Sequence, residues 1–246
     1  MQMKSRQNFI RANHGFTIIE LLIAMVVALL ALGAIYSTFL NQQKSYVVQQ
    51  ETAAMHQNIR SAAFYMEKEI RMAGCDPTGD ASAGIPTVPT VGAGMASIRF
   101  TEDVSDGAGG NSDGDVTDPN EDITYGLDGN RNLIRTDNNG AGLGSAVSAM
   151  VAQNIDAIDF VYLDDASPPN VLNDYIGSGG DVPAANISRI RSVEITIVAR
   201  TGNNTLVSPN NNPYLNQRGR QILGPQGDYV SRRRITYAIK CRNLGL

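Results

Sequence analysis

The sequence predicts an α+β protein, in which one long N-terminal α-helix packs on an antiparallel β-sheet. Three observations support this class. Residues 16–40 form an apolar run with a single charge, at Glu20. Residues 41–74 continue without a proline and place apolar side chains on one helical face. Beyond Cys75, segments that alternate polar and apolar residues are separated by Gly- and Asn-rich stretches, as expected for strands and loops.

The composition is that of a globular body with its own core. The chain has 246 residues, of which 42% are hydrophobic and 18% charged. The net charge of -4 gives no electrostatic reason to expect nucleic-acid binding. The first fifteen residues differ from the body, because they contain Lys4, Arg6 and Arg11 and no acid. A basic leader before an apolar run is expected to stay on the inner side of a membrane.

The apolar run is long enough to cross a membrane. At about 1.5 Å per residue, a helix over residues 16–40 covers the ~30 Å hydrocarbon core. A secretory signal is one alternative, with a weak cleavage site at residues 31–33. The run, however, exceeds the usual length of about 7–15 residues, and it continues as helix. A plain signal anchor is a second alternative, but it does not explain the charged residue Glu20 in the apolar run.

Glu20 is costly in an apolar segment. Insertion scales give an acid at the bilayer centre a cost of roughly 2.5–3.5 kcal/mol, with less near the edge. The apolar run contains no Lys or Arg that could neutralise the carboxylate. A partner for Glu20 must therefore come from outside the segment.

The residues around Gly15 match a processing signal. A basic leader that ends in Gly15, followed by "FTIIE" and an unbroken apolar run, closely resembles the class III signal of type IV pilin-like proteins. In that family a prepilin peptidase cuts after the glycine and methylates the new N-terminal phenylalanine. The resemblance implies cleavage between Gly15 and Phe16 and N-methylation of Phe16. It also implies that Glu20 pairs with the new α-amino group of a neighbouring subunit and sets the register of assembly.

The helix is expected to continue far beyond the membrane segment. It is predicted to run from Phe16 to Ala73, with Gly74 as its stop and Pro77 shortly after. A coiled coil is the alternative for its second half, but a domain on the same chain favours packing in cis. The apolar stripe of that half is predicted at Met55, Ile59, Ala63, Met66 and Ile70.

The remaining residues are predicted to form one antiparallel sheet wrapped on the helix. Residues 128–130, Asp-Gly-Asn, lie between two of the strands and predict a hairpin turn. The resulting pattern is α+β, and the resemblance implies the pilin fold. Strands are predicted near 96–100, 122–127, 132–136, 155–163, 191–200 and 232–242.

The order of these segments also resembles that of the PilW-type minor pilins. The matching stretches are "QNIRSAAFYMEKEIRMAG", "ITYGLDGNRNLIR", "VAQNIDAIDFVYLD", "RSVEITIVART" and "RRRITYAIKCRNLGL". The absence of a proline from the apolar half of the helix favours a minor pilin or pseudopilin over a major pilin. The implied function is initiation or assembly of a pilus, in a priming or tip complex. Two alternatives remain: a J-type pseudopilin of type II secretion, and a tip-located module that binds a surface, calcium or DNA.

The resemblance also implies an organisation and a location. It divides the chain into a leader (1–15), a transmembrane or filament-core helix (16–40), the amphipathic half of that helix (41–74) and a periplasmic β-rich head (75–246). The protein is expected as a single-pass inner-membrane protein with a periplasmic head, and later in a pilus at the cell surface. Its expected partners are other minor pilins, the major pilin, the prepilin peptidase and the inner-membrane assembly platform. No nucleic-acid partner is expected.

The chain has two cysteines, Cys75 and Cys241. If the body lies outside the cytoplasm, a disulfide is favoured over two free thiols. On the topology that the resemblance implies, Cys241 in the last strand can reach Cys75 at the end of the helix. A bridge there would tie the C-terminus to the junction of helix and sheet.

An acidic stretch, residues 101–122, is the one candidate metal site. Clustered carboxylates on a Gly-rich loop suit Ca²⁺, which prefers several oxygen ligands. The EF-hand register fails, however, because Val116 stands where that loop needs a glycine, and a solvated acidic loop is the alternative interpretation. The predicted ligands are Asn111, Asp113, Asp115 and Asp118, with Glu121 or Asp122 closing the shell. No other cofactor is expected.

No enzymatic activity is predicted. The two histidines, His14 and His56, lie in the leader and on the long helix, so they form no zinc site or catalytic triad. His56 is expected on the helix surface. Residues 232–234 are three consecutive arginines, which suit either phosphate binding or, preferably, protection of a sheet edge and pairing with acidic residues.

Overall fold

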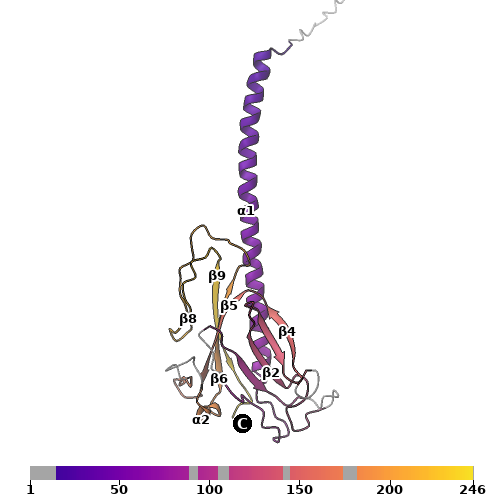
Figure 1. Ribbon diagram of the computed structural model, residues 1–246, viewed down its shortest axis with the longest axis vertical. Coiled ribbons are helices and arrows are strands. Elements are labelled where there is room, and N and C mark those ends of the chain that lie inside the picture. Colours follow the sequence, from indigo (N-terminus) through magenta and orange to yellow (C-terminus); the bar gives the residue numbers. More distant parts are fainter. Residues whose placement is uncertain (1–14, 89–93, 105–110, 141–144, 174–181, 246) are drawn as a thin grey trace, which may run out of the picture. The chain divides into compact units, whose positions relative to one another are not determined.

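The computed structural model contains one long helix followed by antiparallel strands, which confirms the predicted α+β class (Figure 1). The chain divides into two compact units, residues 1–48 and 49–246. Helix α1 (Ile18–Ile70) contributes residues to both. The structure describes residues 15–88, 94–104, 111–140, 145–173 and 182–245.

Helix α1 is slightly shorter than predicted, since it runs from Ile18 to Ile70 rather than from Phe16 to Ala73. A hydrogen-bonded turn follows its last residue, in which the N–H of Cys75 donates to the carbonyl of Met72 over 2.8 Å. Gly74 lies in this turn at a φ of 80°, a conformation that glycine adopts without steric cost. The helix therefore ends before the predicted stop, and Gly74 lies in the turn that follows it.

The second half of α1 buries one apolar stripe. It consists of Met55, Ile59, Ala62, Met66 and Ile70. The prediction named Ala63 in place of Ala62 and was wrong there, because Ala63 is only half-buried. Both alanines fit a helical spacing between Ile59 and Met66, so the sequence alone did not separate them.

Four strands form the first sheet, in the order β1-β2-β3-β4 with every pair antiparallel. The predicted hairpin turn after β2 is present, and the Asp128 carboxylate accepts 2.8 Å hydrogen bonds from the N–H groups of Asn130 and Asn132. Strand β4 was not predicted. The strands are β1 (Ile98–Thr101), β2 (Asp122–Leu127), β3 (Leu133–Asp137) and β4 (Val147–Ala152).

The other strands form two separate sheets, so the prediction of a single sheet was wrong. A three-stranded antiparallel sheet has the order β5-β6-β9, and β7 pairs with β8 in a second small sheet. The short helix α2 (Ala184–Ile187) lies between β5 and β6 in the sequence. The strands are β5 (Ile155–Leu163), β6 (Ser192–Arg200), β7 (Tyr214–Leu215), β8 (Gln221–Leu223) and β9 (Arg232–Lys240).

The β7–β8 pair explains why every residue of β5 is buried. One face of β5 contributes to the main core, and the other lies under β8, where Ala157, Val198 and Ile222 form a small cluster. The chain before β1 passes close to this cluster. At Gly94 a Cβ atom would lie only 2.1 Å from the carbonyl oxygen of Ile222, so a residue with a side chain does not fit there.

A single hydrophobic core joins α1 to both larger sheets. Met66 of α1, Tyr125 of β2 and Ile195 of β6 all belong to it, and none of the three is exposed. Burial of large apolar side chains is the main favourable term in folding. The core therefore holds residues 49–70 and the strands together as one unit.

The core predicts different effects for two neighbouring positions of α1. Met66→Ala should lower the free energy of unfolding by about 2–5 kcal/mol, because it leaves a cavity in a close-packed region. Phe64→Ala should cost less than about 1 kcal/mol, because Phe64 is 64% exposed. Denaturant unfolding of the full chain in detergent measures both. Equal losses at the two positions would contradict this description of the core.

Candidate functional site

The segment that the sequence singles out lies at the start of α1. Gly15 and Phe16 precede the helix and are exposed, Phe16 to 87%. Glu20 lies in the first helical turn, where its backbone N–H donates a 3.3 Å hydrogen bond to Oγ1 of Thr17. A threonine followed by a glutamate at the third position is the pattern of a helix capping box. The sequence analysis missed this role of Thr17, although the spacing itself was visible.

This geometry places the three predicted residues at one helix end. The bond between Gly15 and Phe16 lies outside the helix, so a peptidase can reach it without unwinding a turn. A carboxylate in the first turn is stabilised by the helix dipole, by about 0.3–1 kcal/mol. An amino group created at Phe16 would stand at the same end as Glu20. The rest of the predicted leader, residues 1–14, lies outside the described residues.

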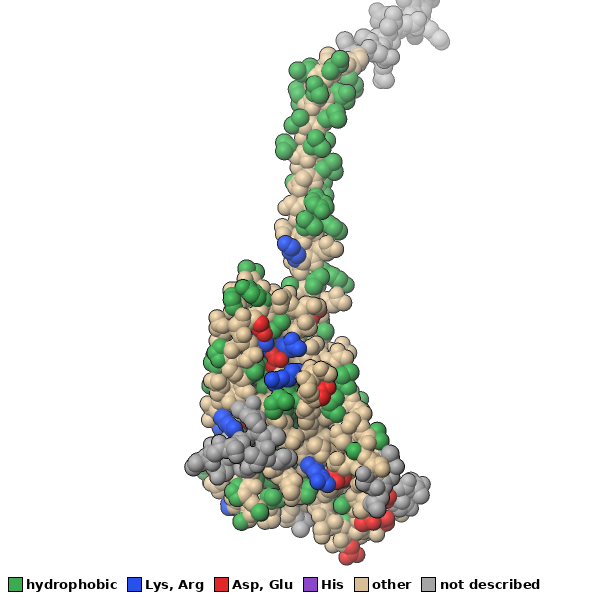
Figure 2. All heavy atoms as spheres, in the orientation of Figure 1, with side chains coloured by type: hydrophobic (Ala, Val, Ile, Leu, Met, Phe, Trp, Pro, Cys, Tyr) green, Lys and Arg blue, Asp and Glu red, His purple; other side chains and the backbone are tan. Residues whose placement is uncertain are grey.

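The first half of α1 exposes apolar side chains along its whole length, as Figure 2 shows. Its most apolar window of 18 residues has a mean hydropathy of 2.8, and no residue of that window is buried. By length and composition α1 can cross a membrane. Exposed apolar surface on this scale requires a cover, which lipid or other apolar helices can provide.

The second unit attaches its first sheet to α1 through a polar contact. The Glu69 carboxylate accepts a 2.6 Å hydrogen bond from the hydroxyl of Tyr125 and a 3.0 Å bond from Nε of Arg135. Tyr125 is fully buried, and both partners of the Glu69–Arg135 ion pair are largely buried. Such a contact fixes the register of helix on sheet, because a shift leaves a buried charge unpaired.

Glu102 is a buried acid beside this contact. It is 8% exposed, and its Oε2 has no hydrogen-bond partner among the described residues. Burial raises the pKa of Glu102 to about 7, and the negative charge of Glu69 adds to this effect. Arg135 opposes the increase in pKa but does not cancel it.

The acidic loop brings together part of the predicted calcium site. Carboxylate oxygens of Asp113, Asp115 and Asp118 lie within 4.8 Å of one another. Asp113 and Asp115 are exposed, and so is Asn111. Three carboxylates this close suit a hard cation, but exposed acids also gather without one.

The two residues expected to close the shell do not join this cluster in the way predicted. Glu121 is buried, and its two oxygens accept hydrogen bonds from the N–H groups of Val104 and Asp118. Asp122 binds Arg99, with 2.8 Å between its Oδ1 and Nε of the arginine. Folding therefore uses these carboxylates to hold the loop and β1, and calcium binding at the other three stays a prediction.

Both cysteines are free thiols in the structure, so the predicted disulfide is not formed there. The chain segments that contain them do meet, since the side-chain amide of Asn243 donates a 3.2 Å hydrogen bond to the carbonyl of Met72. Burial raises the pKa of Cys75, and it raises that of Cys241 to about 12. Protonated thiols exchange slowly, and pairing of the two cysteines stays a prediction.

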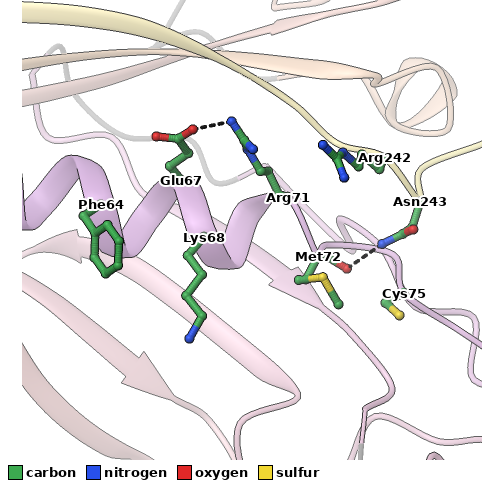
Figure 3. Close-up of a pocket in the computed structure, with 8 residues that line it drawn as sticks. All are labelled: Phe64, Glu67, Lys68, Arg71, Met72, Cys75, Arg242 and Asn243. Carbon is green, nitrogen blue, oxygen red and sulfur yellow. Dashed lines mark hydrogen bonds and ion pairs between the residues drawn. The ribbon is translucent and has the colours of Figure 1, made fainter.

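A pocket of about 630 Å³ lies at this end of α1. Figure 3 shows the residues that line it. Phe64 and Met72 supply exposed apolar surface on one wall, and Arg242 comes from the C-terminal segment. Glu67 and Arg71 form an ion pair across one helical turn.

The three consecutive arginines all contact neighbouring groups, but only Arg232 pairs with acidic residues as the sequence analysis preferred. The side chain of Arg232 is almost fully buried. It forms ion pairs with Asp156 and Asp228, with an N–O distance of 2.5 Å in each pair. Arg233 contacts the ring of His56 at 3.3 Å, and Arg234 donates to a carbonyl of β7. Arg232 is therefore a structural residue rather than a phosphate ligand.

Comparison of the sequence with models of known protein families gives a match at the N-terminus. The prokaryotic N-terminal methylation motif matches residues 10–36, a range that contains Gly15, Phe16 and Glu20. No curated protein matches the chain. Among solved structures, a type IV-like pilin from Thermus thermophilus is similar, with 10% identity and a TM-score of 0.48. That likeness covers 78% of this chain and 97% of the other, and no residue role follows from it.

Glu102 predicts a dependence of stability on pH. Its pKa in the folded protein, about 7, lies above its ordinary value of 4.5, so the folded state binds more protons than the unfolded state between these values. Stability contributed by Glu102 is therefore present below pH 4.5 and is lost as the pH rises towards 7. Glu102→Gln should raise the free energy of unfolding at pH 8 by up to about 3 kcal/mol. Denaturant unfolding at pH 5 and pH 8 measures this difference, and an equal effect at both pH values would contradict it.

The acidic loop predicts a response to calcium. At a Ca²⁺ concentration ten times the Kd, binding should stabilise the fold by about 1.4 kcal/mol and raise the Tm by about 3–6 °C. The double variant Asp113→Asn, Asp115→Asn should lose this response. Thermal unfolding with Ca²⁺, with Mg²⁺ and with EDTA measures it. An unchanged Tm in all three would exclude the site.

Proposed function

We propose that this chain, whose N-terminus is that of a prepilin-like type IV pilin, is a minor pilin that acts in initiation or assembly of a type IV pilus. The strongest support is the methylation motif on a segment with the matching geometry. Gly15 and Phe16 precede the helix, and Glu20 is the only charge in the apolar run that follows. A plain membrane anchor does not need any of these three residues.

The proposed mechanism begins with processing. A prepilin peptidase cuts between Gly15 and Phe16, methylates the new amino group and removes the basic leader. Before assembly, the apolar half of α1 holds the protein in the inner membrane, with the second unit in the periplasm. During assembly, the helix leaves the lipid and packs among the apolar helices of other pilins. Its exposed apolar surface is then covered by protein instead of lipid.

Glu20 fixes the register of that packing. In an apolar filament core, an unpaired carboxylate and an unpaired ammonium are each costly, whereas the pair is strongly attracted. A subunit that aligns its Glu20 with the amino group of a neighbour's Phe16 therefore has one favoured axial position. The Thr17 hydroxyl holds the first turn in place and so limits the movement of the carboxylate.

The minor, PilW-type assignment rests on the continuity of α1 and on the order of the segments in the sequence. Helix α1 has no proline and is continuous to Ile70, as suits a subunit that need not bend within a long filament. The partners implied are other minor pilins, the major pilin and the assembly platform. A pseudopilin of type II secretion uses the same parts, and deletion of the gene separates the two. Loss of surface pili with normal secretion of exoproteins supports the minor pilin, and the reverse result supports the pseudopilin.

Glu20→Ala should allow processing but reduce incorporation into pili by about tenfold or more, because it leaves the neighbour's ammonium unpaired. Thr17→Ala is the matched control, since it removes the capping hydroxyl and keeps the carboxylate. It should cost only about 1 kcal/mol of helix stability and leave most of the assembly intact. Immunoblots of sheared pili and of membranes measure incorporation and processing. Equal losses in the two variants would assign Glu20 to helix capping and contradict the pairing.

A further inference from the structure

Within the part of the chain that the structure describes, strand β4 is an edge strand with no partner on one side. It pairs with β3 alone among the described strands. Val147 is 47% exposed and Met150 53% exposed. In an antiparallel sheet, alternate residues of an edge strand direct their N–H and C=O groups outward. Such an edge is a template for another strand.

The other long edges of the two larger sheets are covered or charged. The edge of β5 is covered on both halves: Ile158 exchanges hydrogen bonds with Gly94 and Ala96, and Leu172 donates to Tyr162. The edge of β1 is covered where Thr101 donates to Gly84 over 2.7 Å. These contacts satisfy the backbone groups that would otherwise attract a strand.

The edge of β9 is protected by charge instead. This strand exposes Arg233, Arg234 and Lys240, and basic side chains on an edge strand discourage pairing with another sheet. Among the described residues, β4 has neither a covering segment nor charged side chains. Residues 145–154 contain no charge and no proline, and the only register shift in the β3–β4 pairing lies at the end of the strand, between Leu133 and Ile134.

We propose that β4 is a docking edge, to which a different pilin-like subunit adds an uncharged extended strand. The proposal rests on the proposed function, which requires contacts between unlike subunits. An uncharged edge of six residues suits such an addition, because backbone hydrogen bonds provide the affinity and no charge must be desolvated. An acidic or basic strand would find no counter-charge on β4.

A second copy of this chain is a poorer occupant of the edge. Two β4 strands that pair antiparallel are related by a two-fold axis perpendicular to the sheet. That axis reverses every direction within the sheet, so residues 49–70 of the two copies, which pack on the sheets, would run in opposite directions. Subunits anchored in one membrane or assembled in one filament need their helices to run the same way. The remaining long edges of a second copy are covered or basic, as described above.

Hydrogen exchange on the full-length chain in detergent tests the proposal directly. The probes are the other proteins of the source organism that have the same N-terminal methylation motif, each purified and added in turn. We expect one of them to form a complex in which the outward amides of residues 147–152 exchange at least about tenfold more slowly. Binding should weaken by about tenfold or more in Met150→Lys and in Val147→Lys, because a charge on the edge opposes pairing. Val207→Lys, at a fully exposed position outside the sheets, is the matched control and should bind normally.

Three results would overturn the proposal. The first is that none of these proteins binds. The second is a complex that leaves exchange in β4 unchanged, or that the two β4 variants form with normal affinity while their thermal unfolding is also normal. The third is protection of β4 in the chain alone as its concentration rises, which would make a second copy the occupant. Normal pili in a deletion strain would refute the proposed function and leave β4 protection standing, so the two failures are distinguishable.

Discussion

The exposed apolar half of α1 is the constraint on which the rest of the structure depends. All residues from 18 to 48 are exposed, and the second unit begins at residue 49. Water is therefore not their working environment. Two covers suit a helix of this length, a bilayer and a bundle of similar helices. In an apolar bundle, a carboxylate such as that of Glu20 is costly unless a positive charge pairs with it.

The second half of the same helix, from residue 49 onward, is attached to the strands of its own unit. The stripe from Met55 to Ile70 provides the apolar part of that attachment, and the ion pair of Glu69 with Arg135 provides its register. One helix thus combines a first half that is long and apolar enough to cross a membrane with a second half that is part of the core. The absence of proline along its length makes this continuity possible.

The sequence predicted most of this architecture, because the relevant signals are local. Strands 122–127 and 155–163 have the boundaries that their alternating and β-branched residues indicated. The division into three sheets was not predictable, since it depends on contacts between distant segments. Strand β4 was missed because its small, uncharged residues have no clear alternation. Glu121 and Asp122 were assigned to a metal site because sequence spacing does not reveal which carboxylates the fold uses for its own hydrogen bonds.

The central claim is that the chain is processed between Gly15 and Phe16 to give a methylated N-terminus. Intact-mass and N-terminal peptide analysis of the protein purified from membranes of its native host tests this most directly. The account predicts a mature chain that begins at Phe16 and has one methyl group on its α-amine. A chain that keeps residues 1–15, or that is cut after the apolar run, would contradict it.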